Sequence, residues 1–191
     1  MAGFGNFSYS ANKLNVMKRK AAFFLVIITT ILILALGIGV FQQMLAKRDI
    51  VNRISVQPDF MAETLYGGIV SSDQLFGQKP VVLTYFNTEC YFCQIEIDAI
   101  KLHKGLQEKA LIVLISDEPI IVLEKFAKSS KLTDKKDVEI YHDRKGEVKD
   151  YFGIHIVPTT FIYDNEAHLV KTFNGQISAD FLHELISNGR P

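Results

Sequence analysis

Residues 81–93 read VVLTYFNTECYFC and place two different structural signals side by side. The run VVLTYFN (81–87) is β-branched and aromatic, which predicts a strand. Cys90 begins a segment that reads as a helix to about Lys109. A thiol at the start of a helix meets unpaired backbone N–H groups and the positive end of the helix dipole, which stabilise its thiolate. The two-residue spacer lets Cys93 form a disulfide with Cys90, so the stretch predicts redox chemistry.

Other kinds of site share this cysteine spacing. Zinc binding usually needs a second pair of ligands, and the chain has only two cysteines. Covalent haem attachment needs a histidine directly after the second cysteine, where this chain has Gln94. A purely structural disulfide is an alternative, but it would close a very short loop and constrain little of the chain. The position between a strand and a helix therefore favours a redox pair, and we expect no metal.

The rest of the chain after Pro80 alternates between strands and helices. LIVLIS (111–116) is a continuous apolar run, which is typical of a strand buried on both faces. Gly67 and Gly68 predict a small hairpin ahead of the main sheet. Further helices are expected at 119–129, with a proline in first position, 147–152 and 178–187, and further strands at 138–141, 159–163 and 169–173. This order predicts an α/β fold with a mixed sheet flanked by helices.

Charge is unevenly distributed along the 191 residues. Lys and Arg total 21 and Asp and Glu total 21, and 48% of the residues are apolar. This balance excludes a wholly basic nucleic-acid binder and an acidic disordered chain. No acidic residue precedes Asp49, and the first 20 residues carry a side-chain charge of +4. The chain after residue 46 holds 17 basic and 21 acidic residues, a charge of −4.

Between these two charge blocks, residues 21–41 contain no charge and no proline. As a helix they would extend roughly 31 Å, close to the hydrocarbon thickness of a bilayer. A cleaved signal peptide is the alternative, but the following sequence, QQMLAK (42–47), offers neither a clear cleavage site nor a cysteine for lipidation. We therefore expect an uncleaved, single-pass signal anchor.

The basic residues predict the orientation of this anchor. Lys18, Arg19 and Lys20 abut the apolar segment, which places residues 1–20 in the cytoplasm. Residues 42–57 are polar and predict a stalk, and Pro58 would open a globular domain over 58–191. That domain would lie outside the cytoplasmic membrane, in the periplasm or at the cell exterior, where paired cysteines imply thiol chemistry or a disulfide.

Two further residues stand out beside the cysteines. Glu96 lies one helical turn after Cys93, on a face that also carries Ile97 and Ile100. A partly buried carboxylate there could exchange a proton with the thiol, although a solvated helix glutamate is the alternative. Pro158 directly precedes a predicted strand, where it could simply mark an edge.

Residues 58–189 resemble the TlpA/ResA-like branch of the thioredoxin superfamily, the membrane-anchored thiol–disulfide oxidoreductases of bacterial envelopes. The resemblance covers several motifs in the right order, at 58–60 (PDF), 67–75, 77–83 (GQKPVVL), 88–96 (TECYFCQIE), 151–154 and 158–164 (PTTFIYD). The long span between Cys93 and Pro158 also suits this branch, which inserts an extra strand and helix into the thioredoxin fold.

The resemblance implies roles for individual residues. Cys90 would be the nucleophile, Cys93 the resolving thiol and Glu96 the active-site carboxylate. Pro158 would be a cis-proline against the cysteine pair, and the backbone beside it, at Val157, would pair with an extended substrate.

The resemblance also implies the partners of such an enzyme. Its relatives reduce disulfides of substrate proteins, and apocytochrome c is a frequent substrate. A transmembrane electron carrier then reduces the oxidised cysteine pair of the enzyme. No diffusible cofactor takes part. Tyr91 and Phe92 would offer an apolar rim to an unfolded substrate segment. We therefore expect a disulfide-containing protein, a membrane electron donor and the lipid bilayer as partners, and no nucleic acid.

The chain departs from the family pattern at four positions. Glu89 replaces the usual tryptophan before the first cysteine, and an acidic neighbour disfavours a thiolate at Cys90. Phe92 stands where many relatives have proline, and Asp98 replaces another common proline. Ala167 stands at a turn position where the family usually has glycine.

Two rival functions use the same fold. A copper chaperone of the Sco type would use a CxxxC motif and a distal histidine; here the spacing is CxxC, although His142, His155 or His168 could supply the third ligand. A thiol peroxidase would place a threonine three residues before its attacking cysteine, whereas Thr88 lies only two residues before Cys90.

Overall fold

The computed structural model describes residues 5–188 and divides the chain into two compact units, Met1–Asp49 and Ile50–Pro191. Residues 1–4 of the expected cytoplasmic segment 1–20, and residues 189–191 of the expected domain 58–191, lie outside the described residues. Helix α1 (Gly5–Ile54) makes up the described part of the first unit, and its residues from Ile50 onward are counted in the second. Its stretch Phe23–Ile54 is long and apolar enough to cross a membrane, by length and composition, and includes most of the expected span 21–41.

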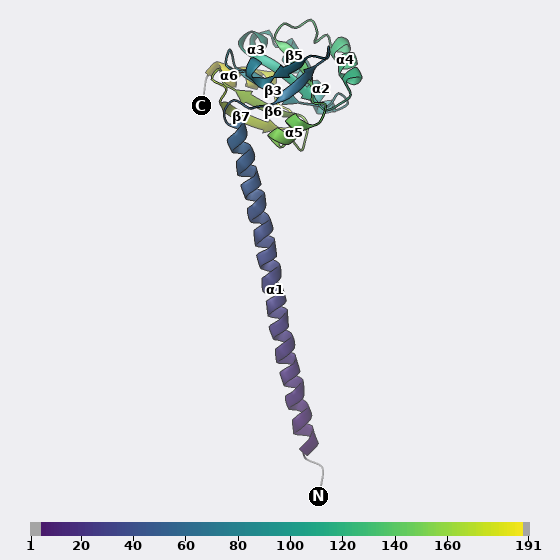
Figure 1. Ribbon diagram of the computed structural model, residues 1–191, viewed down its shortest axis with the longest axis vertical. Helices are drawn as coiled ribbons and strands as arrows, with labels where there is room; N and C mark the ends of the chain where they lie inside the picture. The colour runs from purple at the N-terminus through teal and green to yellow at the C-terminus, as the bar shows by residue number, and fades with distance from the viewer. Residues whose placement is uncertain (1–4, 189–191) are drawn as a thin grey trace. The chain divides into compact units, whose positions relative to one another are not determined.

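The second unit is built on one seven-stranded mixed sheet (Figure 1). The strand order is β2-β1-β5-β4-β3-β6-β7. Strands β3, β4 and β5 are parallel, and β6, β7, β1 and β2 are antiparallel to their neighbours. The bounds are β1 (Met61–Thr64), β2 (Ile69–Ser71), β3 (Val81–Tyr85), β4 (Leu111–Ser116), β5 (Val138–His142), β6 (Thr159–Tyr163) and β7 (Leu169–Asn174), with a short 3-10 helix, η1 (Ser72–Gln74), after β2.

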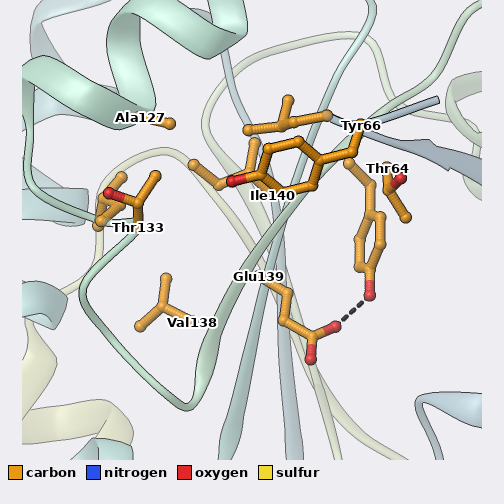
Figure 2. Close-up of a pocket in the computed structure, with 10 residues that line it drawn as sticks. Thr64, Tyr66, Ala127, Thr133, Val138, Glu139 and Ile140 are labelled. Carbon is orange, nitrogen blue, oxygen red and sulfur yellow. Dashed lines mark hydrogen bonds between the residues drawn. The ribbon is translucent and has the colours of Figure 1, made fainter. Parts of the chain in front are cut away.

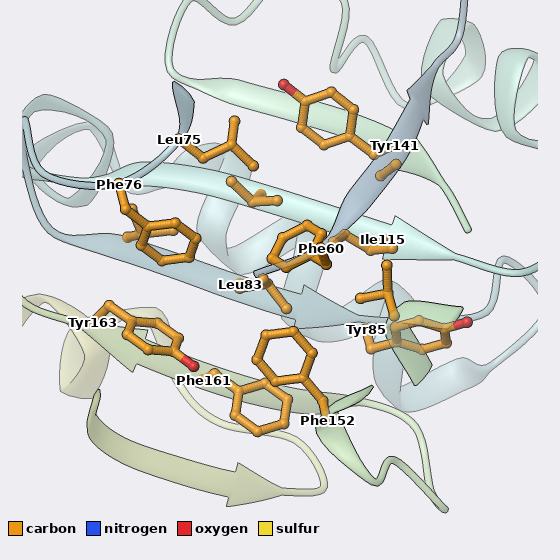
Figure 3. Close-up of a cluster of buried hydrophobic side chains, with 14 of the residues drawn as sticks. Phe60, Leu75, Phe76, Leu83, Tyr85, Ile115, Tyr141, Phe152, Phe161 and Tyr163 are labelled. Carbon is orange, nitrogen blue, oxygen red and sulfur yellow. The ribbon is translucent and has the colours of Figure 1, made fainter. Parts of the chain in front are cut away.

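One face of the sheet carries an aromatic core (Figure 3). Phe152 stacks against Phe161 and Phe60, with ring centroids 4.7 and 5.7 Å away, and Phe76 meets Tyr163 at 4.9 Å. Phe152 comes from helix α5 (Glu147–Phe152), which contributes to the cover of this face. Antiparallel pairing holds β3 and β6 beside each other; the cysteine segment follows β3, and the proline segment comes directly before β6.

The opposite face packs against four helices: α2 (Tyr91–Leu102), α3 (Lys104–Lys109), α4 (Ile120–Ser129) and α6 (Ala179–Asn188). Helix α2 buries Cys93, Ile97 and Ile100 in this core, because these positions recur on one side of the helix. The first turn of α2 is therefore held rigidly at the end of β3.

The expected fold is confirmed in its main features. The mixed sheet is present, Gly67 turns the small hairpin with a φ of 83°, and α4 and β5 form the additional helix and strand. Strand β4 coincides with the predicted run 111–116, and Ser178 Oγ accepts the N–H of Phe181 at the start of α6. Ala167 takes a φ of 60°, the left-handed conformation that the usual glycine would adopt more easily.

Several boundaries differ from the prediction: β5, β7 and α6 by one residue, and three others as follows. The single helix expected from Cys90 to about Lys109 is interrupted at His103, whose ψ of 87° is not helical and whose Nδ1 accepts the N–H of Leu106 as the cap of α3. Pro119 is the N-cap of α4 rather than its first helical residue. Strand β3 ends at Tyr85, two residues earlier than predicted.

Part of the polar segment 42–57 is helical and belongs to the folded second unit. Ile54 is buried in the aromatic core, and its carbonyl accepts the hydroxyl of Tyr163 at 2.9 Å. The carbonyl of Ser55 accepts the N–H of Leu169, also at 2.9 Å. The compact unit therefore begins at Ile50, ahead of Pro58.

Candidate functional site

The two cysteines lie at the start of α2 as free thiols. Cys90 is the N-cap residue, and its Sγ accepts a hydrogen bond from the N–H of Cys93 at 3.2 Å. Cys90 is partly exposed, whereas Cys93 is fully buried. A backbone donor aimed at Sγ stabilises negative charge there. The accessible sulfur is therefore the one suited to attack a partner, and the buried sulfur is protected from outside reagents.

The loop before Cys90 is held by a carboxylate from the loop that follows β4. Glu118 lies just after β4 and accepts the N–H of Thr88 at 2.6 Å and its hydroxyl at 2.8 Å. Gln94 in α2 donates its side-chain amide to the carbonyl of Thr88 at 2.6 Å. Sequence reasoning missed Glu118, since its partner is 30 residues away and no local pattern marks it.

Strand β6 brings the expected proline segment to the cysteines. The Val157–Pro158 peptide bond is cis, as the family resemblance implied. The Cys90 thiol lies 3.8 Å from the carbonyl of Val157 and donates to it. Because β6 pairs with β3 in antiparallel register, this segment meets the start of α2 at the same end of the sheet. The structure thus unites Cys90, Cys93 and Pro158, which lie far apart in the sequence.

Glu96 is completely buried beneath α2. Its Oε1 accepts the hydroxyl of Thr160 at 2.7 Å, with the hydroxyl of Thr84 at 3.5 Å, and its Oε2 accepts the N–H of Ile177 at 2.9 Å. Burial raises the pKa of Glu96, and these hydrogen bonds to its carboxylate oppose that rise. The solvated-helix alternative for this residue is therefore wrong, and the partners on β3, β6 and the loop before α6 are visible only in three dimensions.

Burial also raises the pKa of Cys93, to about 12, and the neighbouring Cys90 and the charge of Glu96 add to the effect. A thiol with this pKa is almost entirely protonated near neutral pH. Cys93 therefore needs a proton acceptor before it can act as a nucleophile.

The surface around Cys90 is apolar. Tyr91 is 69% exposed and Phe92 57%, and their rings meet edge to face at 5.6 Å. Ile156, beside the cis-proline segment, is 53% exposed. Glu89 is also exposed at this surface. Large apolar groups exposed around a reactive sulfur suit contact with a protein partner.

Among the described residues, no metal site joins the cysteines to any of the three histidines considered for copper, and two of these histidines have other partners. His142 bonds to Glu63 at 3.0 Å, and His168 lies near Asp164. Over the residues whose side chains the structure describes, no group of three His, Cys, Asp or Glu is arranged to hold a metal ion.

A cavity of about 290 Å³ lies elsewhere, between the first hairpin, β5 and the end of α4 (Figure 2). Its lining includes Tyr66, Ala127 and Ile140, and neither cysteine contributes to it.

A CxxC pair that begins a helix on this mixed sheet, with a cis-proline against the first sulfur, defines a thiol–disulfide oxidoreductase of the thioredoxin superfamily. The chain belongs to the AhpC/TSA family, whose pattern matches residues 55–172. Within the superfamily it is ResA-like, as the sequence resemblance indicated.

Several known proteins resemble most of the chain. A protein named thiol-disulfide oxidoreductase ResA from Bacillus thuringiensis subsp. konkukian (strain 97-27) is 28% identical over 178 residues, covering 92% of this chain and 100% of that protein. ResA of Bacillus subtilis (strain 168) is 25% identical over 179 residues, covering 92% and 97%.

Solved structures resemble 68–72% of the chain. StoA from Bacillus subtilis is 25% identical, with a TM-score of 0.54, over 68% of this chain and 97% of StoA. A secreted Mycobacterium tuberculosis disulfide oxidoreductase, 20% identical, shares the fold with a TM-score of 0.59, over 72% of this chain and 98% of its own.

Proposed function

We propose that this protein reduces disulfides of proteins outside the cytoplasm, with Cys90 as the nucleophile, Cys93 as the resolving thiol and Glu96 as the proton acceptor. The asymmetry of the two sulfurs carries the proposal. Cys90 is accessible and receives a helix N–H, whereas Cys93 is buried and has a raised pKa. Pro158 and Val157, with Tyr91 and Phe92 at the rim, would bind the substrate segment.

In the first step, the Cys90 thiolate attacks one sulfur of a substrate disulfide. A Cys90–substrate disulfide forms, the substrate disulfide breaks, and one substrate thiolate leaves and takes a proton from water. Glu96 then accepts the proton of Cys93, and the Cys93 thiolate attacks the Cys90 sulfur. The Cys90–Cys93 disulfide forms, the bond to the substrate breaks, and the second substrate thiolate leaves.

The partners and location proposed for this protein follow its resemblance to the ResA-like branch. The substrate would be a disulfide-containing protein such as apocytochrome c, and a membrane protein would supply the electrons that reduce the Cys90–Cys93 disulfide. The helix over 21–41 would act as a single-pass anchor, with the N-terminus in the cytoplasm and the catalytic domain outside. The apolar composition of residues 21–41 and the basic residues before them support this arrangement.

Trapping of substrate tests the proposal. In cells that carry the full chain with Cys93→Ala, the mixed disulfide on Cys90 cannot be resolved, so proteins joined to Cys90 should accumulate and be released by reductant. The double variant Cys90→Ala, Cys93→Ala is the matched control and should trap none. Failure to trap any protein, together with no dithiol activity of the purified wild type, would refute the proposal. Rapid peroxide consumption at Cys90 would instead favour a thiol peroxidase.

A further inference from the structure

Three oxygen atoms form a closed cluster beneath α2. Thr160 Oγ1 lies 2.7 Å from Glu96 Oε1, and Thr84 Oγ1 lies 2.9 Å from Thr160 Oγ1 and 3.5 Å from Glu96 Oε1. Thr84 and Thr160 are paired residues on β3 and β6, so the sheet itself sets their separation. All three residues are fully buried. Each oxygen therefore has the other two as its hydrogen-bonding neighbours, without bulk water.

When Glu96 is ionised, Thr84 can donate to Thr160 at 2.9 Å or to Oε1 at 3.5 Å, and the shorter distance favours one arrangement of the two hydroxyl hydrogens. Thr160 donates to Oε1, and Thr84 donates to Thr160. The N–H of Ile177 donates to Oε2. Among the residues that the structure describes, no buried side-chain oxygen or nitrogen lacks a partner, which fits this arrangement. The bond from Thr160 is charge-assisted and is the strongest of the cluster.

When Glu96 gains a proton, the same triangle accommodates it through rotation of two hydroxyl groups. A proton on Oε1 donates to Thr160, Thr160 turns to donate to Thr84, and Thr84 donates back to Oε1. A hydroxyl can donate or accept, whereas the N–H of Ile177 only donates and so favours an unprotonated Oε2. We propose that Thr84 and Thr160 are positioning residues that form a reversible hydroxyl relay, which lets Glu96 bind and release a proton at Oε1 while it stays buried.

This inference deepens the proposed function and rests on it. The buried carboxyl must accept a proton from Cys93 and return it when the disulfide is next reduced. Without an acceptor for the new O–H, each protonation would leave a buried hydrogen unpaired, which is costly in a dry core. Cys93 is the titratable group that faces Glu96 on α2. The contacts from β3, β6 and Ile177 are hydroxyl and backbone groups.

Infrared difference spectroscopy on the reduced full chain in detergent tests the relay. The carbonyl band of protonated Glu96 is identified by its loss in Glu96→Gln and followed against pH. In Thr160→Val, the ionised form loses a charge-assisted bond and the acid form loses a weaker one. We expect the protonation midpoint to rise by about one pH unit, a tenfold gain in proton affinity.

Thr84→Val should move the midpoint in the opposite direction. The ionised form keeps its bond from Thr160, but in the acid form the rotated Thr160 hydroxyl loses its acceptor. Static donors would instead shift the midpoint upward in both variants, because Thr84 would then act only as a second donor to Oε1. Serine at either position keeps the hydroxyl and should restore the wild-type midpoint. Thr172→Val, on β7, removes a threonine hydroxyl from the same sheet as the control.

An upward shift in Thr160→Val with a downward shift in Thr84→Val supports the relay; equal directions, or no shift in either, overturn it. If Thr160→Val does not fold, the sign of the Thr84→Val shift decides. Proton acceptance by Glu96 is tested separately with an aromatic disulfide reagent, whose second thiol release reports attack by Cys93. If Glu96→Gln leaves the rate of that second release unchanged, the proposed role of Glu96 as proton acceptor is wrong. The relay is still tested by the protonation midpoints of Glu96 in the two threonine variants.

Discussion

Removal of the Glu118 carboxylate should loosen the loop that precedes Cys90. Glu118 accepts the N–H and the hydroxyl of Thr88 at 2.6 and 2.8 Å, and the hydroxyl of Ser116 at 3.2 Å. Hydrogen bonds to a charged group contribute about 1.5–3 kcal/mol each when buried, and less at a half-exposed side chain such as this one. We therefore expect Glu118→Ala to lower the free energy of unfolding by about 2–3 kcal/mol, and Glu118→Gln by about 1 kcal/mol because one acceptor oxygen remains.

Urea unfolding of the reduced full chain measures this loss, and the rate of the first thiol release from an aromatic disulfide reports attack by Cys90. The matched control is the adjacent carboxylate of Asp117, which forms an exposed ion pair with Lys149 at 2.8 Å. Asp117→Ala should cost less than about 1 kcal/mol. If Glu118→Ala lowers the free energy of unfolding no more than Asp117→Ala does, and Cys90 stays equally reactive, then the hydrogen bonds from Thr88 to Glu118, here called the clamp, have no energetic role.

Three other predictions concern stability. Gly153→Ala should lower the free energy of unfolding by about 1–2 kcal/mol, because φ at this position is 65° and the new Cβ would lie 2.7 Å from Cδ1 of Ile50. Urea unfolding measures this loss, and an unchanged free energy of unfolding would contradict the close packing of Ile50 on Gly153. Tyr85→Phe should cost about 1 kcal/mol by removing the buried bond to Asp143, and an unchanged unfolding midpoint would argue against it. Cys93 has a pKa of about 12 when folded, against about 8.5 unfolded, so the folded state binds more protons across this window. The reduced protein should lose stability as pH rises through it. Cys93→Ser should remove only the part of that slope that comes from Cys93, because burial also raises the pKa values of the three tyrosines Tyr85, Tyr141 and Tyr163.

Continuous and periodic patterns in the sequence were enough to predict most of the sheet. The run 111–116 contains five apolar residues followed by Ser116, and it forms β4 without a residue gained or lost. The break at His103 could not be predicted, because no glycine or proline stands at that position and the cap depends on how its ring reaches Leu106. Likewise, the helical end of α1 looked polar in sequence, yet Ile54 enters the core because β6 supplies Tyr163 beside it.

The sequence by itself determined the chemistry of this protein. Two cysteines at a strand–helix junction indicate a redox pair, because helix ends and strand ends are local features, and the resemblance to the ResA-like branch adds Glu96 and Pro158 to the expected site. Tertiary structure alone decided how the groups are tuned. The clamp of Glu118 on Thr88 and the pairing of Thr84 with Thr160 join residues that are 30 and 76 positions apart. The helical face shared with Ile97 and Ile100 predicted partial burial of Glu96, but its complete burial, and the pKa shifts of Glu96 and Cys93, depend on the packing of α2 against the sheet.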